Sequence, residues 1–476
     1  MFTPGNFKRS FVLGIFYFLV ATQVYSQQVE VIYKTYCAGC HGARMEGNSA
    51  PGLIKEQWLY GSTREAIHKN IKSGIPNTEM IGYSNILNDD QITSLVNFIS
   101  SSQKAIARTS ASIPETIVTE EYVLKVEKID SGNTTTPWAI EFVDAKQALV
   151  SEKPGRLRWL INGQLDTVAI RGLPSTHTQS STGGFMDIAL DPKYAENGWV
   201  YLSYSHTNGN LQDKNAAGMT KIIRGKIKQH EWTEEQTLFE VPDSLLVVRG
   251  DRWGCRFLFD KAGYLYFTIG DMGKAMASQD PARATGKVYR IYPDGSIPKD
   301  NPFVNTPGAL PAIFTLGNRN VQGMAQHPVT GAIWSTDHGP RGGDELNILK
   351  KGANYGWPSI TYGIDYSGKT VSEKTEQEGM EQPVVQWTPS IAACPLEFIT
   401  SPLFAKWKNN LMLGALGFEE WRRLVVVNDK VIRQELIMKG YGRVRDIKTS
   451  PDGSLYMLLN KPDMIIRLTP LARSKK

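Results

Sequence analysis

A short run near the amino end of the chain, Cys37-Ala38-Gly39-Cys40-His41, holds the residue types that bind an iron porphyrin. Two thiols separated by two residues have the spacing at which both can add to the vinyl groups of one haem. The imidazole of His41 then lies next to the iron and can serve as one axial ligand. A zinc knuckle would use the same residue types, but the flanking sequence is typical of a cytochrome. The run therefore predicts a covalently attached haem c.

Two helices should position the second axial ligand of this iron. Apolar residues recur every four positions over 67–75 and predict a helix that ends at Gly74. Asn88, with Gln91 three residues later, has the pattern of a capping box that begins another helix. The apolar face of that second helix is formed by Ile92, Leu95, Val96 and Ile99.

Met80 lies on the loop between these helices, from which its sulfur can reach the distal side of the iron. Met45 is the alternative, but it follows the attachment site too closely to cross to the other haem face. We therefore predict His41 and Met80 as the iron ligands, a pair typical of haems with higher reduction potentials. The corresponding domain is a small all-α cytochrome c domain over residues 28–103.

The first residues resemble an export signal. Lys8 and Arg9 precede an apolar run over 11–21, and the following residues permit cleavage before Gln27. The run is short for a membrane span, although an uncleaved anchor is the alternative. We predict a signal peptide over residues 1–26 and a soluble protein in the periplasm, without stable membrane insertion.

The length and charge of the chain limit the kinds of partner that it is expected to bind. With 476 residues the chain is too long for one ordinary domain, and its net charge of +6 comes without a dense cluster of Lys and Arg. Nucleic-acid binding is therefore not indicated. Cys255 and Cys394 are far apart in sequence, so both a disulfide and two buried thiols stay open.

A repeated pattern follows a polar segment, residues 104–120, that is typical of a linker. A turn containing Gly or Asn is followed by a short aromatic or aliphatic strand, and this unit returns six times. The copies lie at 143–150, 191–204, 260–266, 327–334, 406–413 and 450–456. Strand-rich repeats at this interval predict an all-β six-bladed propeller over residues 121–470, with one copy per blade. Two packed β-sandwiches are the alternative.

Two motifs carry a resemblance to a known family. The segment from Gly339 to Asn347, followed by the segment from Gly352 to Pro358, resembles the soluble aldose sugar dehydrogenases of the glucose/sorbosone dehydrogenase group. Residues 286–291, 317–323 and 443–446 match as well. Members of this family are six-bladed propellers that use pyrroloquinoline quinone (PQQ), and the resemblance covers essentially the whole second module.

The resemblance implies a set of cofactor-binding residues. PQQ has three carboxylates, and Arg319, Arg443 and Arg445 occupy the family positions that bind it. A guanidinium group suits a planar carboxylate because the two form paired hydrogen bonds. Asn320 matches a polar contact on the same loop as Arg319.

The resemblance also implies two calcium ions. One would lie against the quinone, bound by the backbone carbonyls of Gly339 and Pro340, since a hard cation prefers oxygen ligands. A second, structural calcium would use Glu345 and the carbonyl of Tyr355. Trp387 precedes a segment that faces substrate in relatives, and either stacking on a sugar or a place in the core fits it.

The chain departs from the family where the chemistry occurs. The family has a catalytic histidine four residues before a matched arginine, which is Arg256 in this chain, and that position holds Arg252. Arginine stays protonated at ordinary pH and is a poor general base. A glutamine position of the family falls at Thr182, and a lysine position falls near Gly417.

Several residues are therefore candidates for the catalytic role. Asp251 and His338 are the nearest candidates for the base, and His177 is a weaker one. Arg252 could instead stabilise an alkoxide or bind an acidic sugar.

Three functions fit these observations. The first is an exported dehydrogenase that oxidises a sugar or related alcohol and passes electrons to its own haem and then to a downstream acceptor. The second is a non-catalytic sugar-binding propeller attached to an electron-transfer cytochrome. The third is a docking protein for another redox enzyme.

Overall fold

The structure is a computed structural model with two compact units, one made mainly of the residues up to 111 and the other of most residues from 112 onward. It describes residues 28–43, 45, 50, 52–53, 58, 60–76, 78, 80–106, 113–180 and 182–471. The signal peptide predicted for residues 1–26 lies outside the described residues. Within the described part of the chain, no helix has the length and apolarity needed to cross a membrane.

The first unit is helical, as predicted. Its described helices cover residues 28–36, α2 (Ala38–His41), α3 (Arg64–Ser73) and α4 (Asp89–Ile106). The capping box is confirmed, because Asn88 N–H donates to Gln91 Oε1 at 3.0 Å and Gln91 N–H donates to Asn88 Oδ1 at 2.9 Å. Gly74, with a φ of 75°, ends α3. Ile75 therefore lies beyond the helix, and its N–H donates to the carbonyl of Met80 at 2.8 Å.

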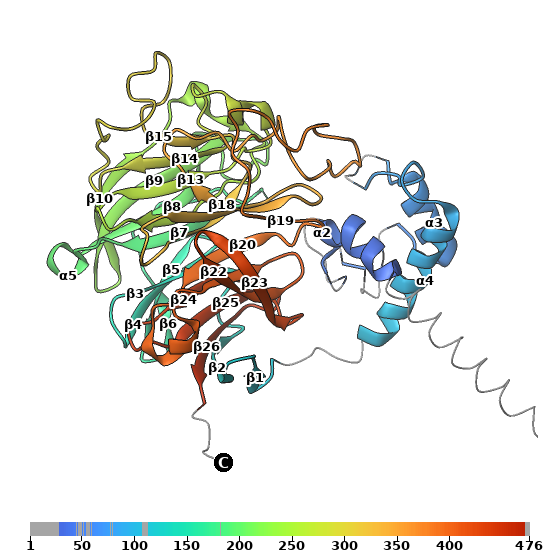
Figure 1. The fold of residues 1–476 in the computed structure, drawn as a ribbon, viewed down its shortest axis with the longest axis horizontal. Helices are drawn as coiled ribbons and strands as arrows, with labels where there is room; N and C mark the ends of the chain where they lie inside the picture. Colours follow the sequence, from blue (N-terminus) through green and yellow to red (C-terminus); the bar gives the residue numbers. More distant parts are fainter. Residues whose placement is uncertain are drawn as a thin grey trace, which may run out of the picture. The chain divides into compact units, whose positions relative to one another are not determined.

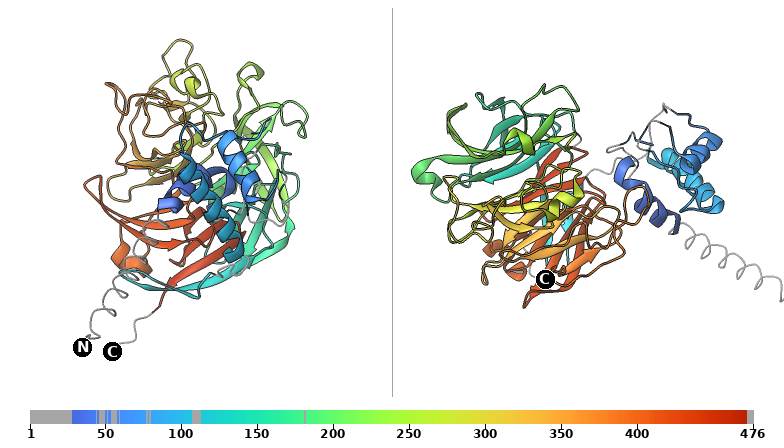
Figure 2. Two further views of the ribbon diagram at one scale, coloured as in Figure 1. Left: turned by 90° about the vertical axis from the view of Figure 1, so that its right-hand side faces the viewer. Right: turned by 90° about the horizontal axis from the view of Figure 1, so that it is seen from above.

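The second unit is a six-bladed propeller, which confirms the predicted fold class (Figures 1 and 2). Each blade is an antiparallel sheet, and its strands are named from the innermost outward. Blade 1 contains β3 (Pro137–Phe142), β4 (Gln147–Glu152), β5 (Arg156–Ile161) and β6 (Gln164–Ala169). Blade 2 contains β7 (Phe185–Leu190), β8 (Trp199–Thr207), β9 (Ala217–Lys228) and β10 (Glu231–Phe239), and β11 (Val247–Val248) pairs with β9. Blade 3 contains β12 (Phe257–Phe259), β13 (Leu265–Ile269), β14 (Lys287–Ile291) and β15 (Ile313–Leu316).

The remaining blades follow the same order. Blade 4 contains β16 (Val321–Gln326), β17 (Ile333–Asp337), β18 (Asp344–Leu349) and β19 (Val385–Trp387). Blade 5 contains β20 (Ala393–Phe398), β21 (Leu411–Ala415), β22 (Glu420–Val427) and β23 (Lys430–Lys439). Blade 6 contains β24 (Arg443–Thr449), β25 (Leu455–Asn460), β26 (Met464–Pro470), β2 (Val123–Ser131) and β1 (Thr116–Val118). Short helical turns connect some strands: α5 (Tyr194–Asn197), η1 (Asp243–Leu245), η2 (Ala275–Gln279) and η3 (Pro402–Trp407).

Blade 6 closes the ring by joining the two ends of the propeller. Strand β2 pairs with β26 in a register that runs from Leu124 opposite Pro470 to Ser131 opposite Met464 (Figure 1). Strand β1 adds to the outer edge of the same sheet. The segment predicted as a linker, 104–120, differs from the structure at both ends, because α4 continues to Ile106 and β1 begins at Thr116.

The innermost strands of the six blades run in the same direction along the propeller axis. A cavity of about 320 Å³ is lined by the later residues of all six innermost strands. The carboxyl ends of these strands therefore meet at that end of the axis. Residues that enter the innermost strands gather at the opposite end, and the candidate site lies there.

Candidate active site

Most of the predicted propeller residues lie at the amino ends of the innermost strands. Thr182 precedes β7, Arg252 precedes β12, and Arg319 with Asn320 precedes β16 directly. Arg443 is the first residue of β24. Loops from four different blades thus converge at this end of the axis.

A buried carboxylate fixes the loop of Arg319 and Asn320. The backbone N–H groups of these two residues donate to Asp337 at 2.9 and 2.5 Å. Burial raises the pKa of Asp337 to about 6, against these hydrogen bonds. The Arg319 guanidinium donates from Nη1 to the carbonyls of His338 and Gly339, at 2.9 and 2.8 Å, and its carbon lies 5.1 Å from the centre of the Trp357 ring.

Arg445 is a buried cation whose neighbours do not favour its charge. Its guanidinium lies 4.0 Å from the centre of the Trp138 ring and donates to Gln322 Oε1 at 3.1 Å. Burial, together with the positive charges of Arg443 and Arg256, lowers the pKa of Arg445 to about 10. An anionic ligand would reverse this unfavourable balance.

His338 lies among the arginines. Burial and the positive charges of Arg319, Arg445 and Arg443 lower the pKa of His338 to about 3, so its imidazole is neutral at ordinary pH. Its buried Nε2 has no hydrogen-bond partner in the described part of the chain. The structure thus brings the predicted arginines together with His338.

Arg252 joins the same site through a buried carboxylate that was not among the residues predicted from the sequence. Its Nε donates to Asp271 Oδ1 at 2.7 Å, and the indole N–H of Trp357 donates to Asp271 Oδ2 at 2.9 Å. The backbone N–H of Asp271 donates to the carbonyl of Arg319 at 2.7 Å. Asp271 is fully buried, so its charge needs a partner such as this guanidinium.

Thr182 orients the other catalytic candidate, Asp251. Its hydroxyl donates to Asp251 Oδ1 at 2.7 Å and accepts the backbone N–H of Arg252 at 2.9 Å. The second Asp251 oxygen lies 3.8 Å from Arg252 Nη1. Gly270 permits this close packing, because a Cβ there would lie 1.9 Å from the Arg252 carbonyl and 2.7 Å from Asn320 Oδ1.

Lys153 is a further site residue that was not predicted from the sequence. It lies on the turn between β4 and β5, and burial with the charges of Arg445 and Lys461 lowers its pKa to about 8 despite the opposing carboxylate of Asp251. The sequence could have indicated Asp271, because this residue comes shortly after the apolar strand of residues 265–269, at the same edge as other site residues. A lone lysine on a turn has no such signal.

The predicted calcium ligands are present, with oxygen donors of the right type. The carbonyl of Gly339 already accepts a hydrogen bond from Arg319, and Pro340 and Tyr355 are buried. Burial and the charges of Asp337 and Asp344 raise the pKa of Glu345 to about 8, and a cation beside it would offset this. Over the described residues, no group of three or more His, Cys, Asp or Glu side chains could hold a metal ion. A calcium ion would therefore depend mainly on carbonyl oxygens.

Four residues considered from the sequence have places in the propeller that the structure shows. Trp387 is buried in an apolar cluster and its N–H donates to Gln434 Oε1 at 3.2 Å, so its place is in the core. The ring of His177 is also buried, and its Nδ1 lies 3.1 Å from the carbonyl of Leu211. The cysteines that the structure describes are all free thiols, so Cys255 and Cys394 do not form a disulfide.

The haem-binding candidates lie in or beside the apolar core of the helical unit. Cys37, which precedes α2, belongs to the apolar cluster of the helical unit, and Met80 packs against that cluster while partly exposed. Cys40 and His41 lie on α2. Met45, the alternative ligand, is 2% exposed and part of the core itself.

A helical domain with a haem-attachment motif, joined to a propeller with clustered cations at one end of its axis, defines a class of two-domain redox proteins. The chain belongs to the family described as Glucose / Sorbosone dehydrogenase, which residues 134–467 match. Residues 26–99 match the family described as Cytochrome C oxidase, cbb3-type, subunit III. The protein is thus a sugar dehydrogenase propeller fused to a cytochrome c domain.

Relatives of the propeller agree with this assignment. The aldose sugar dehydrogenase YliI of Escherichia coli (strain K12) is 36% identical over 329 residues, covering 68% of this chain and 87% of that protein. The crystal structure of the soluble aldose sugar dehydrogenase from Escherichia coli in the apo-form has a TM-score of 0.67 and 32% identity, covering 73% of this chain and 100% of that chain. The PQQ-bound form of aldose sugar dehydrogenase from Streptomyces coelicolor shares the fold, with a TM-score of 0.56 at 22% identity, covering 73% of this chain and 98% of that chain.

Proposed function

We propose that this protein is an exported quinohaemoprotein dehydrogenase that oxidises a sugar or related alcohol with PQQ and passes the electrons to its own haem. A downstream acceptor then takes the electrons from the haem. The observation that carries the proposal is the gathering of Arg319, Arg443 and Arg445 around His338, whose pKa is lowered by burial and by their positive charges. Such a site favours a ligand with several carboxylates.

The residues present fit PQQ and calcium. The carboxylates of PQQ would be bound by Arg319, Arg443 and Arg445, and Asn320 would add a polar contact. A solved relative with the same fold binds PQQ. The carbonyls of Gly339 and Pro340 would bind one calcium ion, and Glu345 with the carbonyl of Tyr355 a second. When bound, the quinone supplies a two-electron acceptor and the adjacent calcium ion a Lewis acid.

The hydroxyl proton of the substrate needs a base, and Asp251 fits this role better than His338. Thr182 orients the Asp251 carboxylate, whose side chain is 43% exposed. His338 is neutral but a weak proton acceptor, because its pKa is about 3. Arg252, held by its ion pair with Asp271, would stabilise negative charge that develops on the substrate oxygen.

The cytochrome domain completes the electron balance. Oxidation of a hydroxyl carbon to a carbonyl releases two electrons and two protons, whereas a haem iron takes one electron at a time. Cys37 and Cys40 would attach the haem, and His41 and Met80 would bind its iron. Because both domains belong to one chain, transfer to the haem is intramolecular and depends little on protein concentration.

The test is haem reduction in the full-length, haem-loaded protein. Addition of PQQ and calcium, followed by a panel of sugars and alcohols, should produce the absorption bands of reduced haem. Arg445→Gln should abolish the response, while Arg283→Gln, at an exposed arginine, should leave it unchanged. If the loaded protein binds PQQ and no compound of the panel reduces the haem, the proposal is wrong.

Arg252→His tests the departure from the family. We expect this variant to reduce the haem at least about tenfold more slowly, since Thr182 and Asp271 are arranged around a guanidinium. A faster reaction would show that Arg252 has no catalytic role of its own.

The second candidate is a sugar-binding propeller without catalysis. The ion pair between Arg252 and Asp271 favours it, because it replaces the imidazole base of the family by a paired cation. This candidate predicts sugar binding without PQQ binding, so a tight PQQ complex that depends on Arg445 would exclude it.

A further inference from the structure

A second group of cations lies beside the arginine site, at the point where Asp251 faces solvent. Lys153 comes from blade 1 and Arg252 from the loop that enters blade 3. Lys461 follows β25 of blade 6 and lies close enough to Lys153 to affect its charge. Lys153 and Arg252, from different blades, therefore both lie near Asp251.

The backbone holds Lys153 firmly in this group. Its N–H donates to the carbonyl of Thr136 at 3.0 Å, and its carbonyl accepts the N–H of Phe185 at 3.0 Å. The lysine stem crosses Gly184, where a Cβ would lie 2.7 Å from Lys153 Cγ. The same Cβ would lie 2.1 Å from the Lys153 carbonyl oxygen, so the glycine makes room for this residue at the entrance to β7.

Arg252 is held just as firmly. Its Nε donates to Asp271 and its backbone N–H donates to Thr182. Its terminal nitrogens have two further neighbours. Nη1 lies 3.8 Å from Asp251 Oδ2, and Nη2 would lie 3.6 Å from a Cβ placed on Gly273. The side chain remains 23% exposed, so a dissolved molecule can reach it.

Two cations, Arg445 and Lys461, and one carboxylate, Asp251, act on the charge of Lys153. Asp251 and Asp271 are the facing carboxylates, and Asp271 is already bonded to Arg252 and Trp357. Burial and the neighbouring cations lower the pKa of Lys153 to about 8 even with Asp251 present. An added anion would stabilise the charged form of this lysine.

We propose that Lys153 and Arg252 form a subsite for the oxoanion of an acidic sugar, a carboxylate or a phosphate, and that anionic sugars rather than neutral aldoses are the substrate class. An ammonium and a guanidinium group together suit an oxoanion. This inference rests on the proposed function only in taking a sugar as the ligand. It does not require that the sugar is oxidised.

Binding measurements test the subsite separately from catalysis. Calorimetric titration of the full-length protein at low salt, with and without PQQ and calcium, compares glucuronate with glucose and glucose 6-phosphate with glucose. We expect at least one of the acids to bind about tenfold more tightly than glucose, and added salt to reduce the difference. The two acids distinguish a carboxylate from a phosphate as the group that is recognised.

Variants at position 153 give the matched comparison. Lys153→Met should remove most of the preference for the acid, and Lys153→Arg should retain it. Lys146→Met, at an exposed lysine on the turn between β3 and β4, is the control and should have no effect.

Three results would overturn the subsite: glucose bound as tightly as both acids, no measurable binding of either acid in both forms of the protein, or an unchanged preference in Lys153→Met. Failure of the proposed function looks different. In that case the acids bind with the expected preference, but no sugar reduces the haem.

Discussion

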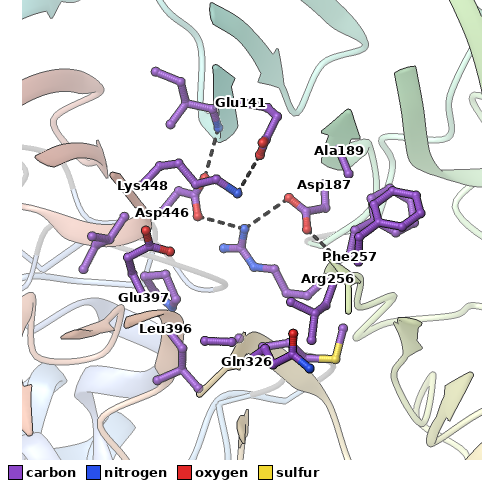
Figure 3. A pocket seen from close by; sticks show the side chains of 18 of the residues that line it. Glu141, Asp187, Ala189, Arg256, Phe257, Gln326, Leu396, Glu397, Asp446 and Lys448 are labelled. Carbon is purple, nitrogen blue, oxygen red and sulfur yellow. Dashed lines mark hydrogen bonds and ion pairs between the residues drawn. The ribbon is translucent and has the colours of Figure 1, made fainter. Parts of the chain in front are cut away.

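Both ends of the propeller axis bury cations, but their surroundings differ. At the carboxyl ends of the innermost strands, Arg256 lies between Asp446 and Asp187, at 3.1 and 3.4 Å, and Lys448 lies 2.6 Å from Glu141 (Figure 3). Burial alone would lower the pKa of these two cations. The carboxylates outweigh burial and raise both pKa values above their usual range.

At the amino ends, the pKa values of two cations move in the opposite direction. That of Arg445 falls to about 10 and that of Lys153 to about 8, because burial is reinforced by other positive charges. The chain thus pairs Arg256 and Lys448 with carboxylates at one end of the axis, whereas at the other end the carboxylates do not outweigh the burial of Arg445 and Lys153. This difference favours the amino ends, rather than the cavity in Figure 3, as the place where we propose that an anionic ligand binds.

The largest effect should follow from replacing Arg256, the cation that lies between two carboxylates at the carboxyl ends of the innermost strands. Arg256→Gln leaves Asp187 and Asp446 buried without a full positive charge between them. We expect the free energy of unfolding to fall by about 3–5 kcal/mol, as measured by chemical denaturation.

Arg283→Gln is the matched control, since Arg283 pairs with Asp280 at 3.8 Å on the surface and both side chains are about half exposed. Its cost should stay below about 0.5 kcal/mol. A cost for Arg256→Gln no larger than that of the control would mean that the two ends of the axis do not differ as described.

The next largest effect concerns PQQ binding by Arg445, at the amino ends of the innermost strands. Arg445→Gln should weaken PQQ binding by about 100-fold, because charge-assisted hydrogen bonds to a carboxylate are lost. Its free energy of unfolding should change by less than about 1 kcal/mol, since the surroundings of Arg445 already disfavour its charge.

Titration of the apoprotein with PQQ, followed by denaturation of the same samples, measures both quantities. If Arg445→Gln loses as much stability as Arg256→Gln, Arg445 belongs with the structural cations. If it binds PQQ as tightly as the wild type, the arginine site is not the quinone site.

Local sequence was enough to predict the blades but not their closure. The repeats correspond to the turns between the innermost and second strands, as at 260–266 between β12 and β13 and at 450–456 between β24 and β25. Turn residues followed by a short apolar strand are a local pattern. The pairing of β2 with β26 joins residues more than three hundred positions apart, and no local pattern specifies such a partner.

The same distinction applies to the site. Arg319 and Asn320 lie in motifs that could be recognised in the chain itself. The neighbours of Arg252, in contrast, come from other loops, and only folding brings Asp271 and Thr182 to its side chain. The charge of Lys153 likewise depends on Arg445 and Lys461 from blade 6. A turn lysine gives no sign of such surroundings.

The smallest expected effect depends on pH. Lys153→Met should increase the free energy of unfolding of the apoprotein at pH 7 by about 1–2 kcal/mol, once partial solvent screening is allowed for. The lysine has a usual pKa of 10.5 and a folded-state pKa of about 8, so its burial is unfavourable wherever both states are protonated. Chemical denaturation from pH 7 to 11 measures this gain.

The sign of the pH dependence follows from proton binding. Between pH 8 and 10.5 the unfolded chain holds the proton of Lys153 more strongly than the folded protein, so the stability of the wild type rises with pH. The advantage of Lys153→Met should therefore shrink over this range and vanish above it, while Lys146→Met should show no such trend. An acidic sugar bound to the wild type should also reduce the advantage at pH 7, because it would add negative charge beside the lysine. A constant advantage at every pH would instead attribute the effect of Lys153→Met to packing, and the amino ends would then lose one of the cations that distinguish them from the carboxyl ends.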